Sequence, residues 1–363
     1  MGASCSRRLR RSLGVLLGSV ALLAAAVATT GCLLSAPGYE GPRTAYFDGK
    51  RFRNEVPDEH GFGAFLRWIT DRDRGPWPEE KLAVSPAAPP PGRVDGGVVR
   101  VTFVNHSTVL LQLDGLNLLT DPVWSDRVGP ASWLGVKRLR EPGLRFEDLP
   151  PIDAVLLSHN HYDHLDLPTL RRIEERFGAP VITGLGNSEL LRRKGIPGGV
   201  DLGWWQTHQL SPEVRVTAVP AAHFSGRGLF DRDRTLWAGF VVEGPSGPVY
   251  FAGDTGWGTH FAAVRKRFGP ARLALLPIGA YRPRWFMKPV HVDPSEAVAA
   301  ARVLEAGTSV GIHFGTFPQA DDGIDEPASD VAVALARLAE GGVPPPRFVV
   351  PANGTVLEVP AAP

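Results

Sequence analysis

Three histidines and one aspartate lie within the six residues from His159 to His164, directly after the apolar run 153–158. Side chains two positions apart on an extended chain point the same way, so His159 and His161 can hold one metal ion together. The turn that follows can direct Asp163 and His164 toward a second ion. The segment therefore predicts a metal site at the end of a strand, with ligands for two neighbouring ions.

Single ligands of the same chemical types follow three later apolar strands. They are His223 after residues 216–220, Asp254 after residues 249–252 and His313 after residues 309–312. An isolated His-x-His pair is usually a surface loop that binds metal by accident, but here later strand ends supply the missing partners. The joint pattern favours a built metal centre, although a motif is confirmed only by its structural context.

The motif His-x-His-x-Asp-His, with the later His, Asp and His, resembles the metallo-β-lactamase superfamily. More narrowly, several blocks resemble the family of phospholipases D that hydrolyse N-acyl-phosphatidylethanolamine. The blocks are Ser158–Asp166, Thr120–Pro122, Leu236–Gly239, Gly253–Gly256, Pro277–Tyr281, Pro283–Lys288, His291–Pro294 and Ile312–Phe317. The sequences Arg-Trp-Phe-Met and His-Val-Asp-Pro within them are more specific than the ligands, which all binuclear members of the superfamily share.

The resemblance implies a binuclear site in which Asp163 and Asp254 are the catalytic residues. Nitrogen and oxygen ligands without sulfur suit two Zn²⁺ ions, and Fe or Mn is not excluded. Two ions roughly 3.5–4 Å apart generate a bridging hydroxide that can attack a phosphodiester, and Asp163 would orient this hydroxide and accept its proton. The implied ligands are His159, His161 and His223 for one ion, Asp163, His164 and His313 for the other, and Asp254 between them.

Three further site residues follow from the same resemblance. Tyr162 and His291 match positions that contact the substrate next to its phosphate, and Asp121 matches a carboxylate that orients a ligand imidazole. From the residues alone, Tyr162 could simply pack, His291 could be solvated, and Asp121 could start a turn before Pro122.

Aromatic and histidine residues outside the motif have more than one interpretation. Residues 285–287, Trp-Phe-Met, are expected to line an acyl-binding groove, although such clusters more often belong to a core. We interpret His60, His106, His208 and His260 as structural or surface residues.

Composition restricts the class of protein. The 363 residues are 43% hydrophobic, which is enough for a sizeable core. The net charge is +1, and the chain from Cys32 onward carries −3 because four arginines and no acidic residue precede it. No basic face for nucleic acid is indicated. The two cysteines, Cys5 and Cys32, both precede the globular part, which excludes disulfides and thiolate ligands from the catalytic domain.

Residues 1–34 are typical of a secretory leader, because the arginines precede an uncharged run from Leu13 to Ala28. Gly31 and Cys32 resemble a bacterial lipobox, which favours a lipidated Cys32 as the membrane anchor. The uncharged run continues to Leu34 and could instead span a bilayer. An N-myristoylation pattern at residues 1–6 and simple cleavage are further alternatives. We expect an exported protein anchored in the membrane through its N-terminus; nothing indicates its oligomeric state.

Three regions are predicted: the leader at 1–34, a tether and N-terminal extension at 35–97, and a catalytic domain at 98–363. A short amphipathic helix at 61–69 is expected to pack its apolar face onto the domain, and membrane contact is the alternative. Strands and helices alternate after residue 98, which favours mixed sheets with outer helices. The resemblance sharpens this prediction to an α/β fold, an αββα sandwich with a binuclear metal site at one edge. The predicted helices are 167–177, 188–194, 261–268, 294–304 and 327–338, and the predicted strands are 98–104, 108–113, 116–119, 154–157, 181–183, 214–219, 238–242, 249–252, 273–276, 309–312 and 348–350.

Three functions are compatible with these features. The first is a phospholipase D-type hydrolase that cleaves N-acyl-phosphatidylethanolamine to phosphatidic acid and an N-acylethanolamine. The second is a hydrolase of the same fold acting on a soluble lactone, ester or phosphodiester. The third is a non-catalytic envelope protein that binds metal or lipid. The complete ligand set disfavours the third, and the Arg-Trp-Phe-Met block with a membrane-directed leader favours the first. A phospholipid or another small molecule is thus the expected partner.

Overall fold

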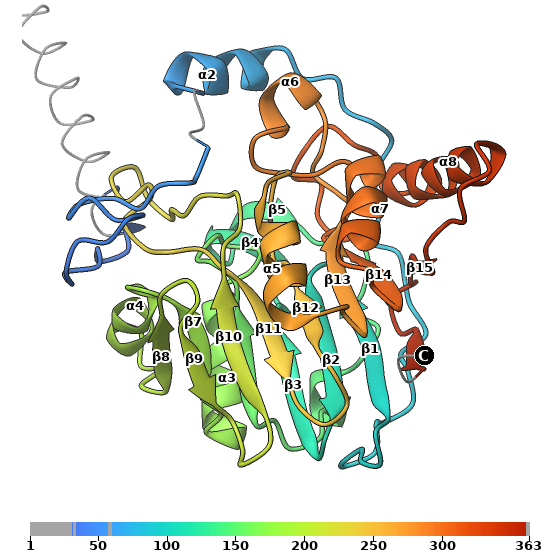
Figure 1. The fold of residues 1–363 in the computed structure, drawn as a ribbon. Coiled ribbons are helices and arrows are strands. Elements are labelled where there is room, and N and C mark those ends of the chain that lie inside the picture. The colour runs from blue at the N-terminus through green and yellow to red at the C-terminus, as the bar shows by residue number, and fades with distance from the viewer. Residues whose placement is uncertain (1–30, 32–33, 57–59, 361–363) are drawn as a thin grey trace, which may run out of the picture.

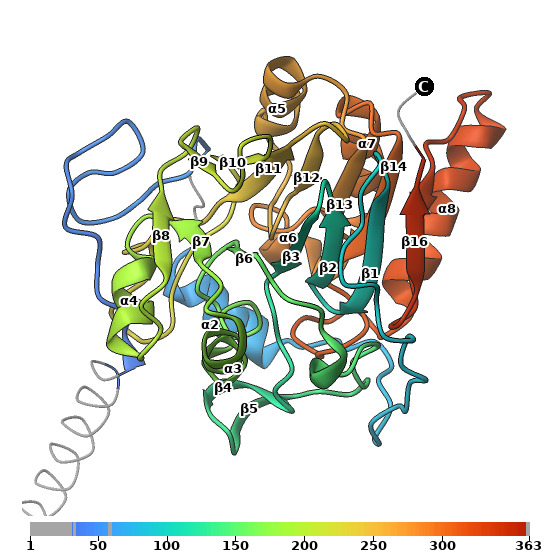
Figure 2. The same ribbon diagram turned by 90° about the horizontal axis from the view of Figure 1, so that it is seen from below.

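The computed structural model describes residues 31, 34–56 and 60–360. Two seven-stranded sheets lie face to face, and helices cover their outer faces (Figure 1 and Figure 2). The inner faces form the main core, in which Phe103 and Leu111 of one sheet belong to the same cluster as Phe240 and Leu275 of the other. The predicted αββα sandwich is confirmed.

The first sheet begins with an antiparallel meander and continues with parallel strands, in the order β16-β1-β2-β3-β6-β7-β8. The turn between β2 and β3 consists of Asp114 and Gly115, both with positive φ, as a two-residue hairpin loop requires. The bounds are β1 Val99–Asn105, β2 Thr108–Leu113, β3 Leu116–Thr120, β6 Ala154–Leu157, β7 Val181–Gly184, β8 Gly199–Leu202 and β16 Val356–Val359. The helical elements of this half are η1 Phe146–Asp148, which precedes β6, and α3 Leu167–Phe177 and α4 Asn187–Arg193, which follow β6 and β7.

The second sheet has the order β15-β14-β13-β12-β11-β10-β9, antiparallel from β9 to β12 and parallel from β12 to β15. Its strands are β9 Thr207–Gln209, β10 Arg215–Val219, β11 Gly239–Glu243, β12 Val249–Phe251, β13 Leu273–Pro277, β14 Thr308–Ile312 and β15 Phe348–Val349. The crossover helices are α5 His260–Phe268, α7 Pro294–Val303 and α8 Glu326–Glu340. A capping box between Asp293 and Glu296, with Pro294 in the first turn, fixes the start of α7 three residues after His291.

The N-terminal extension is packed against the domain. Phe47 and Phe52 are buried with Trp237, so residues 35–56 are not the free tether that the sequence suggested. Cys32 and the uncharged run of the leader lie outside the described residues. Among the residues that the structure does describe, no helix is long and apolar enough to cross a membrane.

Helix α2, Phe62–Thr70, lies over α6, Arg284–Met287 (Figure 1). Trp68 stacks on Phe286, with ring centroids 5.1 Å apart, and joins the helix to the domain. Phe65, Leu66 and Ile69 are instead exposed. The prediction that this apolar face packs onto the domain is therefore wrong for these three side chains.

Short elements account for the other differences from the prediction. The hairpin of β4 Arg127–Ala131 and β5 Leu134–Lys137 forms a separate two-stranded sheet. It was not predicted because Gly129, Pro130 and Gly135 interrupt any alternation of apolar and polar residues. Both this hairpin and α6 lie beside the site described next.

Candidate active site

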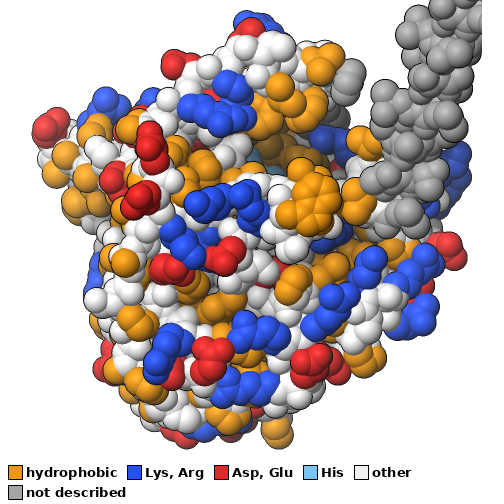
Figure 3. All heavy atoms as spheres, turned by 180° about the vertical axis from the view of Figure 1, so that it is seen from behind, with side chains coloured by type: hydrophobic (Ala, Val, Ile, Leu, Met, Phe, Trp, Pro, Cys, Tyr) orange, Lys and Arg blue, Asp and Glu red, His pale blue; other side chains and the backbone are white. Residues whose placement is uncertain are grey.

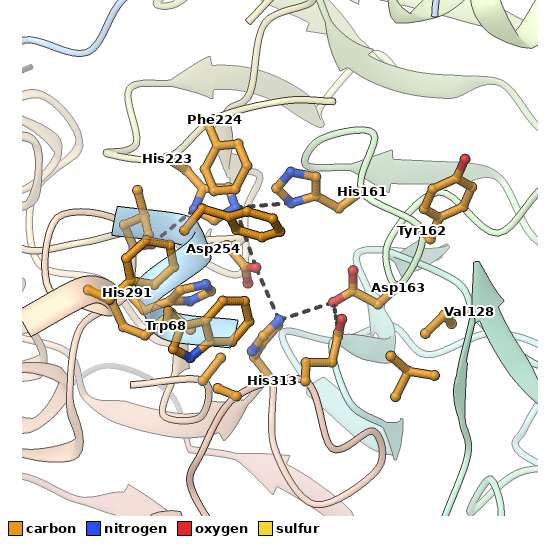
Figure 4. Close-up of a pocket in the computed structure, with 18 of the residues that line it drawn as sticks. Trp68, Val128, His161, Tyr162, Asp163, His223, Phe224, Asp254, His291 and His313 are labelled. Atoms are coloured by element: carbon orange, nitrogen blue, oxygen red, sulfur yellow. Dashed lines mark hydrogen bonds and ion pairs between the residues drawn. The ribbon is translucent and has the colours of Figure 1, made fainter. Parts of the chain in front are cut away.

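The metal-ligand candidates lie in loops that follow four strands, at one edge of the sandwich. The motif His159–His164 follows β6, whereas His223, Asp254 and His313 follow β10, β12 and β14. Side chains from these loops point toward a common centre (Figure 4). The structure thus brings together all seven ligands that the sequence suggested.

Three histidines form one half of the cluster. Nε2 of His159 lies 2.7 Å from Nδ1 of His161, and Nε2 of His223 lies 3.3 Å from the same atom. The ring of His223 is held by the carbonyl of Val290, which accepts a hydrogen bond of 2.9 Å from Nδ1. This hydrogen bond leaves Nε2 free to bind an ion, as expected of a ligand imidazole.

Asp254 lies at the centre of the cluster. Its Oδ2 is 3.1 Å from Nε2 of His164 and 3.0 Å from Nε2 of His313. The same oxygen is 3.7 Å from His223 and 3.9 Å from His159, so one carboxylate contacts both halves. Asp254 therefore occupies the position that a bridging ligand requires.

The residue before Asp254 must be glycine. Gly253 has a φ of 61°, and a Cβ at this position would lie 2.6 Å from Cβ of Ser158. Only a residue without a side chain can bring the loop after β12 this close to the loop after β6. The sequence Gly-Asp thus serves to place the Asp254 carboxylate against the histidine motif.

Asp163 completes the second half. Its Oδ2 lies 3.1 Å from Nε2 of His164 and 3.3 Å from Nε2 of His313, and it also accepts a hydrogen bond from Gln319. Other buried polar atoms at this point have no hydrogen-bond partner, including Oδ1 of Asp254 and Nδ1 of His291. Unpartnered buried nitrogen and oxygen atoms of this kind fit a bound metal such as Zn²⁺.

Asp121 fixes the orientation of His164. Its Oδ2 accepts hydrogen bonds of 2.6 Å from Nδ1 of His164 and 2.6 Å from the hydroxyl of Ser158, while its Oδ1 accepts one of 2.7 Å from the Ser158 amide. The carboxylate is fully buried. This is the arrangement expected of a carboxylate that orients a ligand imidazole.

His106 is a site residue that the sequence did not identify. It begins the first hairpin loop, directly after β1, and its Nε2 lies 3.0 Å from Oδ2 of Asp163. Its carbonyl accepts a hydrogen bond from the amide of His313, so the residue contacts two ligands. His106, Asp121 and His313 all have positive φ, a conformation that costs about 1–3 kcal/mol and concentrates at functional sites.

Tyr162 lines the pocket with its ring, but its hydroxyl points away from the cluster (Figure 4). The hydroxyl donates a hydrogen bond of 2.8 Å to the carbonyl of Arg227, and the Arg227 guanidinium stacks 3.9 Å from the ring centre. The hydroxyl is therefore already engaged by Arg227. A contact between Tyr162 and a substrate would have to use the ring face.

His291 faces the cluster from the loop before α7. Its ring lies 5.1 Å from that of His223 and 5.3 Å from that of His313, and its buried Nδ1 has no hydrogen-bond partner. Burial lowers the pKa of His291 to about 4. The neutral ring can thus offer a hydrogen bond to a polar group bound beside the ligands.

Burial and charge divide the histidines into two groups. Burial lowers the pKa of His159 and His223 well below the usual value and that of His161 to about 3, so these rings are neutral. Burial also opposes charge on His313, but the attraction of Asp254 outweighs it and raises the pKa to about 9. The pKa of His164 is raised for the same reason. Metal binding would therefore displace protons mainly from the second half of the cluster.

A cavity of about 700 Å³ opens above the cluster and is mostly apolar. Phe286 and Met287 line it as expected, but Trp285 lies outside and is exposed. Helix α2 and the hairpin β4–β5 form two of its walls. Phe65 and Trp68 of α2 line the cavity, and so do Val128, Pro130 and Val136 of the hairpin.

Comparison with known proteins identifies the family. The family described as Beta-lactamase superfamily domain matches residues 116–314. An uncharacterized protein of Mycobacterium tuberculosis is 42% identical over 263 residues, which cover 69% of this chain and 70% of that protein. N-acyl-phosphatidylethanolamine-hydrolyzing phospholipase D 1 of Caenorhabditis elegans is 38% identical over 231 residues, which cover 60% of this chain and 64% of that protein.

A mitochondrial enzyme of Saccharomyces cerevisiae with the same phospholipase D name is 35% identical over 247 residues, 66% of this chain and 52% of that protein. Among solved structures, an isothiocyanate hydrolase from Delia radicum gut bacteria has the same fold, with a TM-score of 0.57 at 18% identity, covering 72% of this chain and all of that one. The chain therefore belongs to the metallo-β-lactamase superfamily and is one of its metal-dependent hydrolases.

Proposed function

We propose that this protein is a phospholipase D-type phosphodiesterase that hydrolyses N-acyl-phosphatidylethanolamine. The observation that carries the proposal is the position of the apolar cavity directly above the His/Asp cluster. A diester with long acyl chains can place its phosphate at the ligands while a chain lies against Trp68, Phe286 and Met287. The similarity to the two named phospholipases D supports the same substrate.

In this reaction a water oxygen forms a bond to phosphorus, and the bond from phosphorus to the ethanolamine oxygen breaks. The products are phosphatidic acid and an N-acylethanolamine, whose oxygen takes up a proton. We infer that the seven ligands hold two Zn²⁺ ions, which when bound would lower the pKa of a water molecule and neutralise charge on the phosphate.

The protein's own residues would orient the reactants. Asp163 is the proposed acceptor of the proton from water, and contacts with His106 and Gln319 hold its Oδ2 in place. His291, with its unpartnered Nδ1, is placed to donate a hydrogen bond to a phosphate oxygen. A displacement at phosphorus is fast only when water and phosphate are held in the correct relative orientation, and these residues would hold them so.

We further propose that the protein is exported and anchored through its N-terminus, with Cys32 acylated. The support is the leader sequence at 1–34, which precedes the described domain. Mass spectrometry of the wild type should find a diacylglyceryl group on Cys32, and Cys32→Ala should move the protein to the soluble fraction or leave the leader unprocessed. An intact Met1 in the mature protein would contradict acylation and favour a transmembrane anchor.

The test of the activity is a substrate panel with metal-loaded and chelator-treated protein. N-acyl-phosphatidylethanolamine should yield N-acylethanolamine and phosphatidic acid in equal amounts by mass spectrometry, and chelation should abolish both. Hydrolysis of a soluble lactone or phosphodiester without hydrolysis of any N-acylated phospholipid would refute the lipid substrate and leave a hydrolase of another specificity.

A further inference from the structure

Large apolar side chains are exposed on three separate segments around the cavity. Trp133 and Leu134, at the turn between β4 and β5, are 77% and 48% exposed, and Leu229 and Phe230 are 64% and 50% exposed. Helix α2 adds a third group. We call the full set the apolar rim: Phe65, Leu66, Ile69, Trp133, Leu134, Leu229 and Phe230.

Each segment that carries the rim also contributes a residue to the lining of the cavity. Phe65 of α2 lines the cavity itself, as do Gly135 and Val136, which directly follow Leu134 in the hairpin, and Arg232, which lies two residues after Phe230. Figure 3 shows hydrophobic side chains gathered about a hollow on this face, with histidine visible inside it. The exposed side chains therefore lie on the segments that border the opening to the ligands.

The described chain also begins at this rim. A Cβ on Gly31 would lie 3.0 Å from the ring of Phe230 and 3.1 Å from Cδ1 of Leu229. The amide of Ala36 donates a hydrogen bond of 2.7 Å to Asp231 in the same loop. Gly31 thus lies beside Leu229 and Phe230 of the rim.

The charge of the hairpin differs from that of the chain after the leader. Arg127 and Lys137 are paired across β4 and β5, and no acidic residue lies between them in the sequence. The chain from Cys32 onward carries −3. The hairpin thus carries two cations at its base and an exposed tryptophan at its turn. Such a combination suits an interface of phosphate headgroups and acyl chains, where Trp is enriched and Lys and Arg bind anionic lipids.

We propose that the apolar rim docks on the surface of a lipid bilayer, so that the cavity entrance faces the lipid headgroups. The proposal rests on the proposed function, because a lipid substrate must enter from that surface. A protein partner that covered the rim would close the entrance, whereas a bilayer that covers it supplies the substrate. Exposed apolar patches of this kind mark interaction sites.

A direct test measures whether Trp133 contacts acyl chains. The full-length protein is reconstituted in phosphatidylcholine–phosphatidylglycerol vesicles with and without brominated acyl chains, which quench tryptophan on contact. The emission of Trp133, taken as the difference between wild type and Trp133→Phe, should be quenched. Trp237→Phe is the matched control, because Trp237 is buried and its emission should not change.

A kinetic test separates docking from chemistry. The double variant Trp133→Ser, Leu134→Ser alters two side chains that do not line the cavity. Turnover of vesicle-borne N-acyl-phosphatidylethanolamine should fall roughly tenfold, given the apolar area removed, while turnover of a short-chain monomeric analogue stays unchanged. The control Val333→Ser, Val356→Ser removes two exposed apolar residues elsewhere and should affect neither rate.

The outcomes distinguish this proposal from the proposed function. Unquenched Trp133 in protein that hydrolyses vesicle lipid would overturn the docking surface and leave the activity standing. Quenched Trp133 without hydrolysis of any N-acylated phospholipid would support the docking surface and refute the activity. A dimer in solution, cross-linked through the rim with Trp133 unquenched, would assign the rim to a second copy of the chain and also overturn the proposal.

Discussion

Replacing Asp121 should affect both folding and metal binding. In Asp121→Ala three buried donors lose their acceptor, namely the amide and hydroxyl of Ser158 and Nδ1 of His164. A buried donor without a partner costs about 1–3 kcal/mol, so the variant loses about 3–9 kcal/mol. Since domains are typically stable by about 5–15 kcal/mol, the metal-free alanine variant should be close to unfolding.

Asp121→Asn is the sharper test because it keeps the shape of the side chain. If its oxygen keeps the hydrogen bond to the Ser158 amide, its NH₂ group faces Nδ1 of His164. His164 can accept from this group only as the Nε2-protonated tautomer, and that proton then occupies the nitrogen that faces Asp163 and Asp254. Metal affinity should therefore fall about 10–100-fold, the range for loss of a carboxylate that orients a ligand.

Competition with a chromogenic chelator measures the affinity, and thermal unfolding with and without metal measures the stability. Asp114→Asn is the control, because Asp114 also accepts a hydrogen bond from a serine but lies at the β2–β3 turn. Its metal affinity should equal that of the wild type. An Asp121→Asn protein with wild-type affinity and turnover would refute the reasoning and leave Asp121 as a turn residue.

Further predictions concern the ligands and Asp163. Elemental analysis should find about two transition-metal ions per chain and losses at both sites in Asp254→Ala; active protein without metal would contradict this. Asp163→Asn should retain much of its metal but show a severely reduced kcat, and unchanged turnover would remove Asp163 from catalysis. His106→Ala should lower kcat with little change in KM, with partial recovery in His106→Asn; an equal loss in both parameters would instead indicate a structural role. The pKa of His313 rises from about 6.5 unfolded to about 9 in the folded metal-free protein, so its stabilisation is fully present below pH about 6.5 and is lost as pH rises through about 9. The Tm of chelator-treated protein should fall over that window and the Tm of metal-loaded protein should fall less, whereas parallel curves would argue against the assignment.

The ligands could be predicted because each follows a short apolar strand, and strand ends meet at one edge of a sheet. His106 could not, because it lies 57 residues before Asp163 in a hairpin loop without a recognisable motif. Only the pairing of the strands brings the two together. The direction of the Tyr162 hydroxyl was equally inaccessible, since it depends on Arg227 from a distant loop.

Segments without a periodic pattern of apolar residues could not be predicted from the sequence either. Phe47 and Phe52 are isolated aromatics in a Gly- and Pro-containing segment, so nothing local indicates that they are buried. Helix α2 shows the opposite difficulty. Its apolar face was recognised, but amphipathic periodicity does not reveal whether that face meets a protein core or remains exposed.

The division of the ligands between the two sheets has a kinetic consequence. The contact between His161 and His223 spans 62 residues and that between Asp163 and His313 spans 150, so each ion would close a long loop and cross-link the two layers. An unfolded chain cannot assemble these ligands without the entropic cost of closing such loops. Bound ions would therefore oppose separation of the two layers, and metal-loaded protein should unfold more slowly than chelator-treated protein.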